Sequence, residues 1–373
     1  MRPAGEKPRR ARRLEGEIEF SRPVFECPRC RRSLAPLDLE LGLDAHDQFS
    51  RLARKKMAYA AASASFAQAA KDLKHQAELD VSPAQIARVA ERAGAVLIER
   101  QHGREAGWNA PVGGGQTVAE PEIACPMLVI QADSTSVLTV PGEENKMVYV
   151  ATAFDASARG EKDSSQRPFL TERRYAAGPG EFEDFTTSLR ALAQRMGASQ
   201  AQEIAFVSDG APGLGAWAEK NIPGVLLILD PWHVFDRLSK MLDALDESGE
   251  AKKTRLDGWI STILASHVEE VIEDLRQLRT GRRGKKRKII EGEMNYLENN
   301  RPRMDYARYK AEGWPIGSGA IEGACKNLVK RRFGLTGARW KRARLMYVLA
   351  LRLSIFNEEW ENDWQSEAMR PAA

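Results

Sequence analysis

Three apolar runs in this chain each end on an aspartate, and this repeated pattern constrains the fold more than any other feature. The runs are PMLVIQAD, ending at Asp133, EIAFVSD, ending at Asp209, and GVLLILD, ending at Asp230. Continuous apolar runs of this length are typical of buried strands, which deliver their last side chain to the rim of a sheet. Carboxylates that converge there repel one another unless divalent cations hold them.

The order of elements around these runs predicts an α/β core over residues 121–235. Strand-like segments PMLVIQAD, KMVYVATAFDAS and RRYAAG come first, followed by the amphipathic helix DFTTSLRALAQRMG, a strand, a second helix and a last strand. This is the order of the ribonuclease H-like core, a mixed sheet in which the fourth strand lies beside the first. The sequence then becomes helical and highly charged, which predicts a helical insertion over residues 236–312.

A fourth acid, Glu322, opens the basic segment AIEGACKNLVKRR. The glycine-rich PIGSG before it favours a capped helix start, where the helix dipole stabilises a carboxylate. In the expected core, Asp133, Asp209 and Glu322 occupy three converging positions, and their oxygen ligands suit two Mg²⁺ or Mn²⁺ ions. The alternative for Glu322 alone is a surface pair with Lys326, four residues later.

The sequence does not decide whether Asp209 or Asp230 is the second ligand. We prefer Asp209 because the expected topology puts the fourth strand beside the first and the fifth strand further out. Asp230 and His233, at a strand-to-helix junction, would then form an accessory pair near the metal ions or the scissile phosphate. A structural histidine is the alternative for His233.

The first 46 residues combine a basic tail with a Cys-x-x-Cys knuckle, Cys27 and Cys30, that could hold Zn²⁺. A structural zinc site needs four ligands; His46 is a conceivable third, and no fourth is evident. Two reduced cysteines in a turn are the alternative. The chain has four cysteines in all, too few for a disulfide framework, which indicates a reducing compartment.

Residues 47–110 are alanine-rich and have helical periodicity, and a glycine-rich spacer at 111–120 follows them. The segment SFAQAAKDLKHQAE is separated by a short turn from VSPAQIARVAERAG, in which Ser82 can cap the helix and Pro83 suits its first position. This is the outline of a helix-turn-helix, although an ordinary antiparallel helix pair fits it equally well. The side chains that would meet a major groove are those of Gln85, Arg88 and Arg92.

Positive charge gathers in residues 1–13, 279–288 and 323–357, although the net charge is only +4. The last of these segments, within a C-terminal region at 313–362, has nine basic residues and no acid. Its charges alternate with apolar residues, so we expect packed helices that hold phosphates. The middle run also fits a solvated loop. The predicted DNA contacts of the last segment are Lys326, Lys330, Arg331, Arg332, Arg339, Trp340 and Lys341.

These motifs resemble the DDE transposases of bacterial insertion sequences, most closely the Kra-type family. The similarity covers about residues 25 to 360 and rests on CPRC with APLDLELGL, VSPAQIARVAERAG, VIQADSTSV, VSDGAPGLGAW, LDPWHVFDRL and, most specifically, GSGAIEGACKNLVKRRFGLTGARW. It implies that Asp133, Asp209 and Glu322 bind the catalytic metal ions and that Asp230 with His233 is an accessory motif. Such transposases tend to carry another cysteine pair upstream, which this chain lacks.

The resemblance implies a transposase that cleaves transposon ends and transfers the freed 3′-hydroxyl to target DNA, with double-stranded DNA as partner and a homodimer or higher oligomer as the working form. The alternatives are a catalytically inactive, transposase-derived DNA-binding protein and a structure-specific nuclease of the same fold. The sequence has no stretch of about 18 apolar residues and no apolar signal segment. We therefore expect a bacterial cytoplasmic, nucleoid-associated protein without membrane association.

Overall fold

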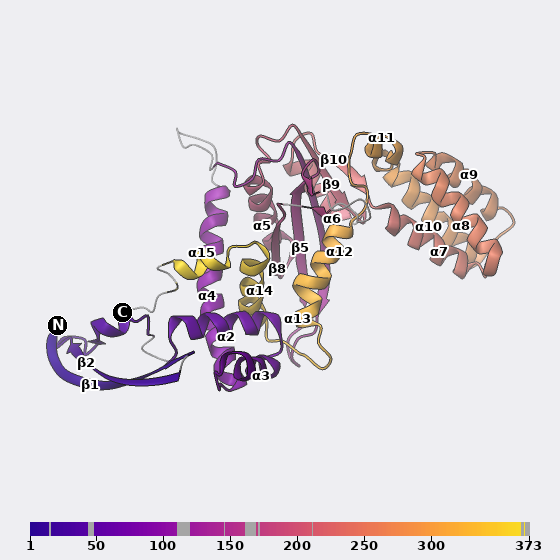
Figure 1. Cartoon of the computed structure of the whole chain (residues 1–373). Helices are drawn as coiled ribbons and strands as arrows, with labels where there is room; N and C mark the ends of the chain where they lie inside the picture. The colour runs from indigo at the N-terminus through magenta and orange to yellow at the C-terminus, as the bar shows by residue number, and fades with distance from the viewer. Residues whose placement is uncertain are drawn as a thin grey trace.

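The computed structural model describes most of the chain. The described residues are 1–14, 16–43, 48–109, 120–144, 146–160, 169–170, 172–210, 212–366 and 369. His46, the conceivable third zinc ligand, and the glycine-rich spacer up to residue 119 lie outside them. Figure 1 shows a central sheet with helices on both faces, a helical lobe on one side and an N-terminal ribbon on the other.

The central sheet has five strands in the order β10-β9-β4-β5-β8. Their bounds are β4 Met127–Val137, β5 Lys146–Asp155, β8 Arg174–Pro179, β9 Glu203–Ser208 and β10 Leu226–Leu229. The first three are antiparallel neighbours, while β9 and β10 run parallel to β4. Helices α5, Phe182–Arg195, and α6, Pro212–Asn221, occupy the two predicted positions. A mixed α/β fold is therefore confirmed, and its strand order is compatible with a ribonuclease H-like core.

Alternating side chains of the strands divide the sheet into two buried faces. Leu128 and Ile130 of β4 pack beneath α5 and α6, together with Phe206 of β9. On the opposite face, Val129 and Val207 join a second cluster that continues into the helical lobe. Both faces are covered, which explains why the predicted strands read as continuous apolar runs instead of alternating ones.

The C-terminal basic segment covers the opposite face of the sheet from α5. It comprises α12 Gly319–Ala324, a π-helical stretch η2 Cys325–Lys330, α13 Arg331–Phe333 and α14 Arg342–Phe356, and α15 Trp360–Gln365 follows it and contacts α14. Ile321, Cys325 and Leu328 pack against Val148 and Val150 of β5. The wide π turn falls directly after the helix that carries Glu322, a placement common at functional sites.

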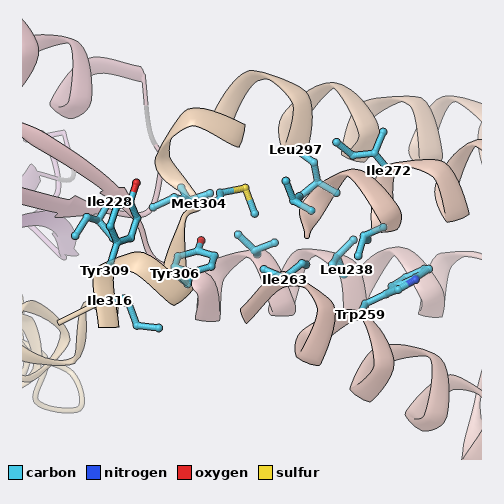
Figure 2. Close-up of a cluster of buried hydrophobic side chains, with 14 of the residues drawn as sticks. Ile228, Leu238, Trp259, Ile263, Ile272, Leu297, Met304, Tyr306, Tyr309 and Ile316 are labelled. Atoms are coloured by element: carbon cyan, nitrogen blue, oxygen red, sulfur yellow. The ribbon is translucent and has the colours of Figure 1, made fainter. Parts of the chain in front are cut away.

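The predicted insertion is helical and begins with α7 at Pro231 instead of residue 236, because Asp230 caps the helix immediately after β10. The helices are α7 Pro231–Ala244, α8 Gly249–Leu264, α9 Val268–Arg279, α10 Gly284–Asn300, η1 Arg301–Arg303 and α11 Tyr306–Ala311. Figure 2 shows the core of this lobe running from Trp259 through Tyr306 to Ile228 of β10. The lobe and the sheet therefore share one continuous hydrophobic core.

The N-terminal helices are α2 Arg51–Ser63, α3 Phe66–Ala77 and α4 Pro83–Trp108. Their core includes Ala350 and Leu351 of α14 and Trp360 of α15. The predicted regions 47–110 and 313–362 are consequently one packed unit. None of the helices in the described part of the chain combines the length and apolar composition needed to cross a membrane.

The predicted basic tail, for which the sequence indicates no secondary structure, forms a strand. β1 Arg2–Arg13 pairs antiparallel with β2 Gly16–Glu26, and the short β3 Ser33–Leu34 adds to β2; α1 Pro36–Glu40 follows. Arg10 faces Glu19 across the ribbon, and their side chains pair at 3.4 Å. Opposite charges on facing positions stabilise such a ribbon, a cross-strand effect that a count of arginines does not reveal.

The crossing of α4 and α14 generates our first prediction. A Cβ atom added at Gly94 would lie 2.4 Å from the carbonyl oxygen of Tyr347, whereas one at Gly103 of the same helix would meet nothing within 4 Å. Gly94→Ala should lower the free energy of unfolding by about 1–3 kcal/mol because the helices must separate. Gly103→Ala should raise it by up to about 1 kcal/mol through helix propensity. Denaturant titration measures both, and equal effects would contradict the close crossing.

Candidate metal centre

The register of the parallel strands brings three aspartates to one level. Val207 of β9 pairs with Gln131 of β4 on one side and with Ile228 of β10 on the other. Two residues further along each strand are Asp133, Asp209 and Asp230. Side chains two residues apart point to the same face, so all three acids lie on the face that carries the helical lobe and α12.

Asp133, on β4, is partly buried. Burial raises the pKa of its carboxyl above the ordinary value, the backbone N–H of Ser134 at 2.6 Å opposes the rise, and the charges of Asp209 and Glu322 add to it, while His233 lowers it. These interactions show that Asp209, Glu322 and His233 all lie close enough to act on Asp133. Divalent cations bound beside Asp133 would stabilise its charged form and offset the repulsion from Asp209 and Glu322.

Asp209 lies in a tight turn that the helical lobe holds in place. The hydroxyl of Tyr296 on α10 donates to its carbonyl oxygen at 3.2 Å. Gly210 follows with a φ of +83°, and a Cβ there would lie 2.7 Å from Leu229 and 3.1 Å from the Tyr296 hydroxyl. Burial raises the pKa of Tyr296 to about 12, so its hydroxyl stays a proton donor at neutral pH. The glycine is thus required for both its dihedral angle and its lack of a side chain.

Asp230 is fully buried, and both of its carboxylate oxygens accept hydrogen bonds. Oδ1 accepts from the backbone N–H of Trp232 at 2.8 Å and so caps α7. Oδ2 accepts from the backbone N–H of Ser318 at 3.1 Å and from the Ser318 hydroxyl. The hydroxyl oxygen of Ser318 also lies 3.0 Å from Oε1 of Glu322. Asp230 therefore joins the start of α7 to the start of α12.

Asp230, His233 and Glu322 could nevertheless hold a metal ion, because one ligand atom from each lies within 4.8 Å of the others. The His233 Nε2 atom is 3.8 Å from Asp230 Oδ2, and the imidazole is 43% exposed. Among the described residues no other such group is found. The structure thus brings the predicted accessory pair next to the predicted ligand Glu322, and among the described residues it does not bring Asp133 or Asp209 into this group.

Sequence reasoning missed two residues that anchor Glu322. Gln131, 1% exposed, donates from Nε2 to the Gly317 carbonyl at 3.0 Å, and its Oε1 accepts from the Ile321 N–H at 3.1 Å. Ser318 forms the bonds to Asp230 described above. A polar residue inside the apolar run PMLVIQAD was the available signal for Gln131, since buried polar side chains are retained where hydrogen bonds need them.

The basic residues of the C-terminal segment divide into exposed and buried ones. Arg332 is 2% exposed, stacks at 4.7 Å on Trp340, and donates from Nε to the Ala61 carbonyl at 2.8 Å. Trp340 is 5% exposed. The prediction that Arg332 and Trp340 contact DNA is wrong, because neither side chain reaches the surface. The remaining predicted contacts are exposed: Lys326, Lys330, Arg331, Arg339 and Lys341.

The predicted groove-reading residues lie at the start of α4. Arg88 and Arg92 are exposed. The side chain of Gln85, however, accepts from the Ser82 backbone N–H at 2.9 Å, while the Ser82 hydroxyl accepts from the Gln85 N–H at 3.2 Å. This reciprocal capping box occupies the Gln85 amide oxygen. Gln85 therefore has a structural role in helix initiation, in addition to any contact that it makes with DNA.

Cys27 and Cys30 lie in the turn between β2 and β3. Backbone N–H groups of Cys30 and Arg29, with the Cys30 side chain, lower the pKa of the Cys27 thiol. No third ligand from the described residues joins the two cysteines in a potential metal site. Zinc binding by Cys27 and Cys30 therefore stays a prediction, because the described residues supply no further ligand.

The chain matches no family model and no curated protein sequence. The resemblance to DDE transposases accordingly remains a hypothesis based on the quoted motifs.

The raised pKa of Asp133 generates our second prediction. A carboxyl whose pKa is higher in the folded than in the unfolded protein holds more protons when folded, so stability falls as pH rises between the two values. Asp133→Asn removes this dependence and keeps an acceptor for the Ser134 N–H. Without divalent ions, the variant should be more stable than the parent at pH 7, and its advantage should shrink as pH falls below the carboxyl range. Urea titrations in a chelator at several pH values measure this, and a pH-independent difference would contradict it.

Proposed function

We propose that this protein is a metal-dependent DNA transposase with a ribonuclease H-like catalytic core. The observation that carries the proposal is the parallel register that brings Asp133 and Asp209 to one level at the carboxyl end of the strands, beside the group of Asp230, His233 and Glu322, whose ligand atoms lie within 4.8 Å of one another. The exposed cations of η2, α13 and the following loop continue directly from the helix that carries Glu322. A cluster of acids beside a basic surface suits a reaction at a phosphodiester.

The donor set fits Mg²⁺ or Mn²⁺. Asp133, Asp209 and Glu322 supply hard carboxylate oxygens, and a divalent ion would stabilise the charged form of Asp133, whose pKa is raised by burial and then by the charges of Asp209 and Glu322. When bound, such ions activate a water or a 3′-hydroxyl and stabilise the leaving oxygen. Asp230 holds the first turns of α7 and α12 together and orients His233 and Ser318 beside Glu322.

The remaining residues of the site have roles in orientation and binding. His233, partly exposed at the start of α7, can donate a proton or a hydrogen bond to a phosphate or a leaving oxygen near Glu322. Lys326 and Arg331 project from the same continuous helix as Glu322 and would hold the DNA backbone. Arg88 and Arg92 would contact the transposon end from α4.

The third prediction concerns the second ligand. Asp133→Ala and Asp209→Ala should abolish nicking of transposon-end DNA in Mg²⁺ and leave DNA binding nearly intact, because both acids face the ions. Asp230→Asn should instead lower the thermal stability, since it weakens the contacts of a fully buried carboxylate with Ser318 and the start of α7. Nicking assays and thermal melting curves of the three variants distinguish a metal ligand from a structural carboxylate.

Nicking that survives in Asp209→Ala but not in a folded Asp230→Asn variant would transfer the second ligand to Asp230. Nicking that survives in Asp133→Ala would refute the proposed function. A strand-transfer assay with pre-cut ends separates a transposase from a nuclease, because only the transposase joins the 3′-hydroxyl to target DNA.

The fourth prediction concerns the basic surface. Replacing Lys326, Arg331 and Lys341 by alanine should make log K fall less steeply with log salt concentration, by up to about 0.9 per lost phosphate contact. Lys253→Ala on the exposed side of α8 is the matched control and should leave the slope unchanged. Fluorescence anisotropy with duplex DNA over a salt series measures the slopes. Equal slopes for the triple variant and the parent would show that this surface does not meet the DNA backbone.

A further inference from the structure

The start of α12 is capped from the sheet and not by its own N-cap residue. Ser318 occupies the N-cap position but makes no side-chain capping bond, because its hydroxyl contacts Asp230 and Glu322 instead. The N–H of Ile321, the group that an N-cap side chain would ordinarily satisfy, donates to the side-chain oxygen of Gln131 at 3.1 Å. The side-chain Nε2 of Gln131 donates to the Gly317 carbonyl at 3.0 Å. One side chain of β4 therefore holds both sides of the turn before Glu322.

The position of Gln131 matters because it connects the strand that carries Asp133 to the helix that carries Glu322. Gln131 lies two residues before Asp133 on the same strand and the same face, and its partner Ile321 immediately precedes Glu322. Fixing Ile321 to Gln131 thus sets the position of Glu322 relative to Asp133 through a short, rigid path. A buried amide costs free energy unless it is hydrogen-bonded, and an apolar side chain would suit the surrounding core better. Packing alone does not account for this residue.

We propose that Gln131 is a positioning residue that places the Glu322 carboxylate against Asp133 for joint metal binding. The inference rests on the proposed function, because it assigns Gln131 a part in the same site. Ligand positioning by a neighbouring hydrogen-bonded side chain typically changes metal affinity or activity 10–100-fold when it is lost. Gln131 would contact neither ion nor DNA; it would act through the backbone of α12.

The test compares Gln131→Met with Thr152→Val. Methionine keeps the length of the side chain and removes both hydrogen bonds. Thr152 lies directly opposite Gln131 on β5, is fully buried, and has a hydroxyl without a partner among the described residues. Thr152→Val therefore changes the same region without removing a hydrogen bond to α12. Mn²⁺ affinity by electron paramagnetic resonance, hydrogen exchange of residues 318–324, nicking in Mg²⁺ and the melting temperature are measured for each.

Gln131→Met should remain folded, exchange faster at 318–324, bind Mn²⁺ about 10-fold or more weakly and nick more slowly, with part of the nicking rate regained at high Mn²⁺. Thr152→Val should match the parent in all four measurements. Unchanged Mn²⁺ affinity and nicking in folded Gln131→Met, with an active parent, would overturn the positioning role. If Gln131→Met does not fold, Gln131→Asn, one methylene too short to reach both partners, replaces it with the same expectation and the same overturning result.

The proposed function can fail separately. A parent protein that neither nicks DNA nor loses Mn²⁺ affinity on Asp133→Ala would refute the metal site itself, whatever Gln131 does.

Discussion

The parallel register of β4, β9 and β10 is the constraint on which the rest of the site depends. It brings Asp133, Asp209 and Asp230 to one level on one face, a concentration of charge that a folded protein must neutralise or use. Asp230 accepts hydrogen bonds from the starts of α7 and α12. Asp133 keeps an unfavourable environment, as its raised pKa shows. A carboxylate in such an environment lowers the free energy of unfolding, and a cost of this kind is typical of functional positions.

The helical lobe packs directly against the sheet, and the N-terminal helices are joined to it through α14. The helical lobe starts from the Asp230 cap, shares its core with Ile228 and returns Tyr296 to the Asp209 turn. The N-terminal helices pack on α14, and Gly94 permits their close crossing.

Much of this architecture was predictable because its signals are local. The strands, the two helices between them and the start of α12 follow from apolar runs, periodicity and turn residues, and the predicted strand order is compatible with the observed one. The roles of Gln131 and Ser318 were not predictable, because each depends on a partner over 80 residues away. The backbone pairing of β1 with β2 likewise is not evident from the number of basic residues in β1.

The basic C-terminal segment shows why charge counting overestimates a binding surface. Arg352 donates from Nε to the Leu328 carbonyl at 2.6 Å and from its terminal nitrogens to Ala62 and Asn327, while Arg332 reaches Ala61. Burial lowers the pKa of both guanidinium groups to about 10, so both stay charged at neutral pH. Carbonyl oxygens near the end of α2 and in the π turn compensate these buried charges. Two of the nine cations thus join the N-terminal helices to the segment that carries Glu322, and only exposed side chains such as Lys326 and Arg331 remain to meet a phosphate.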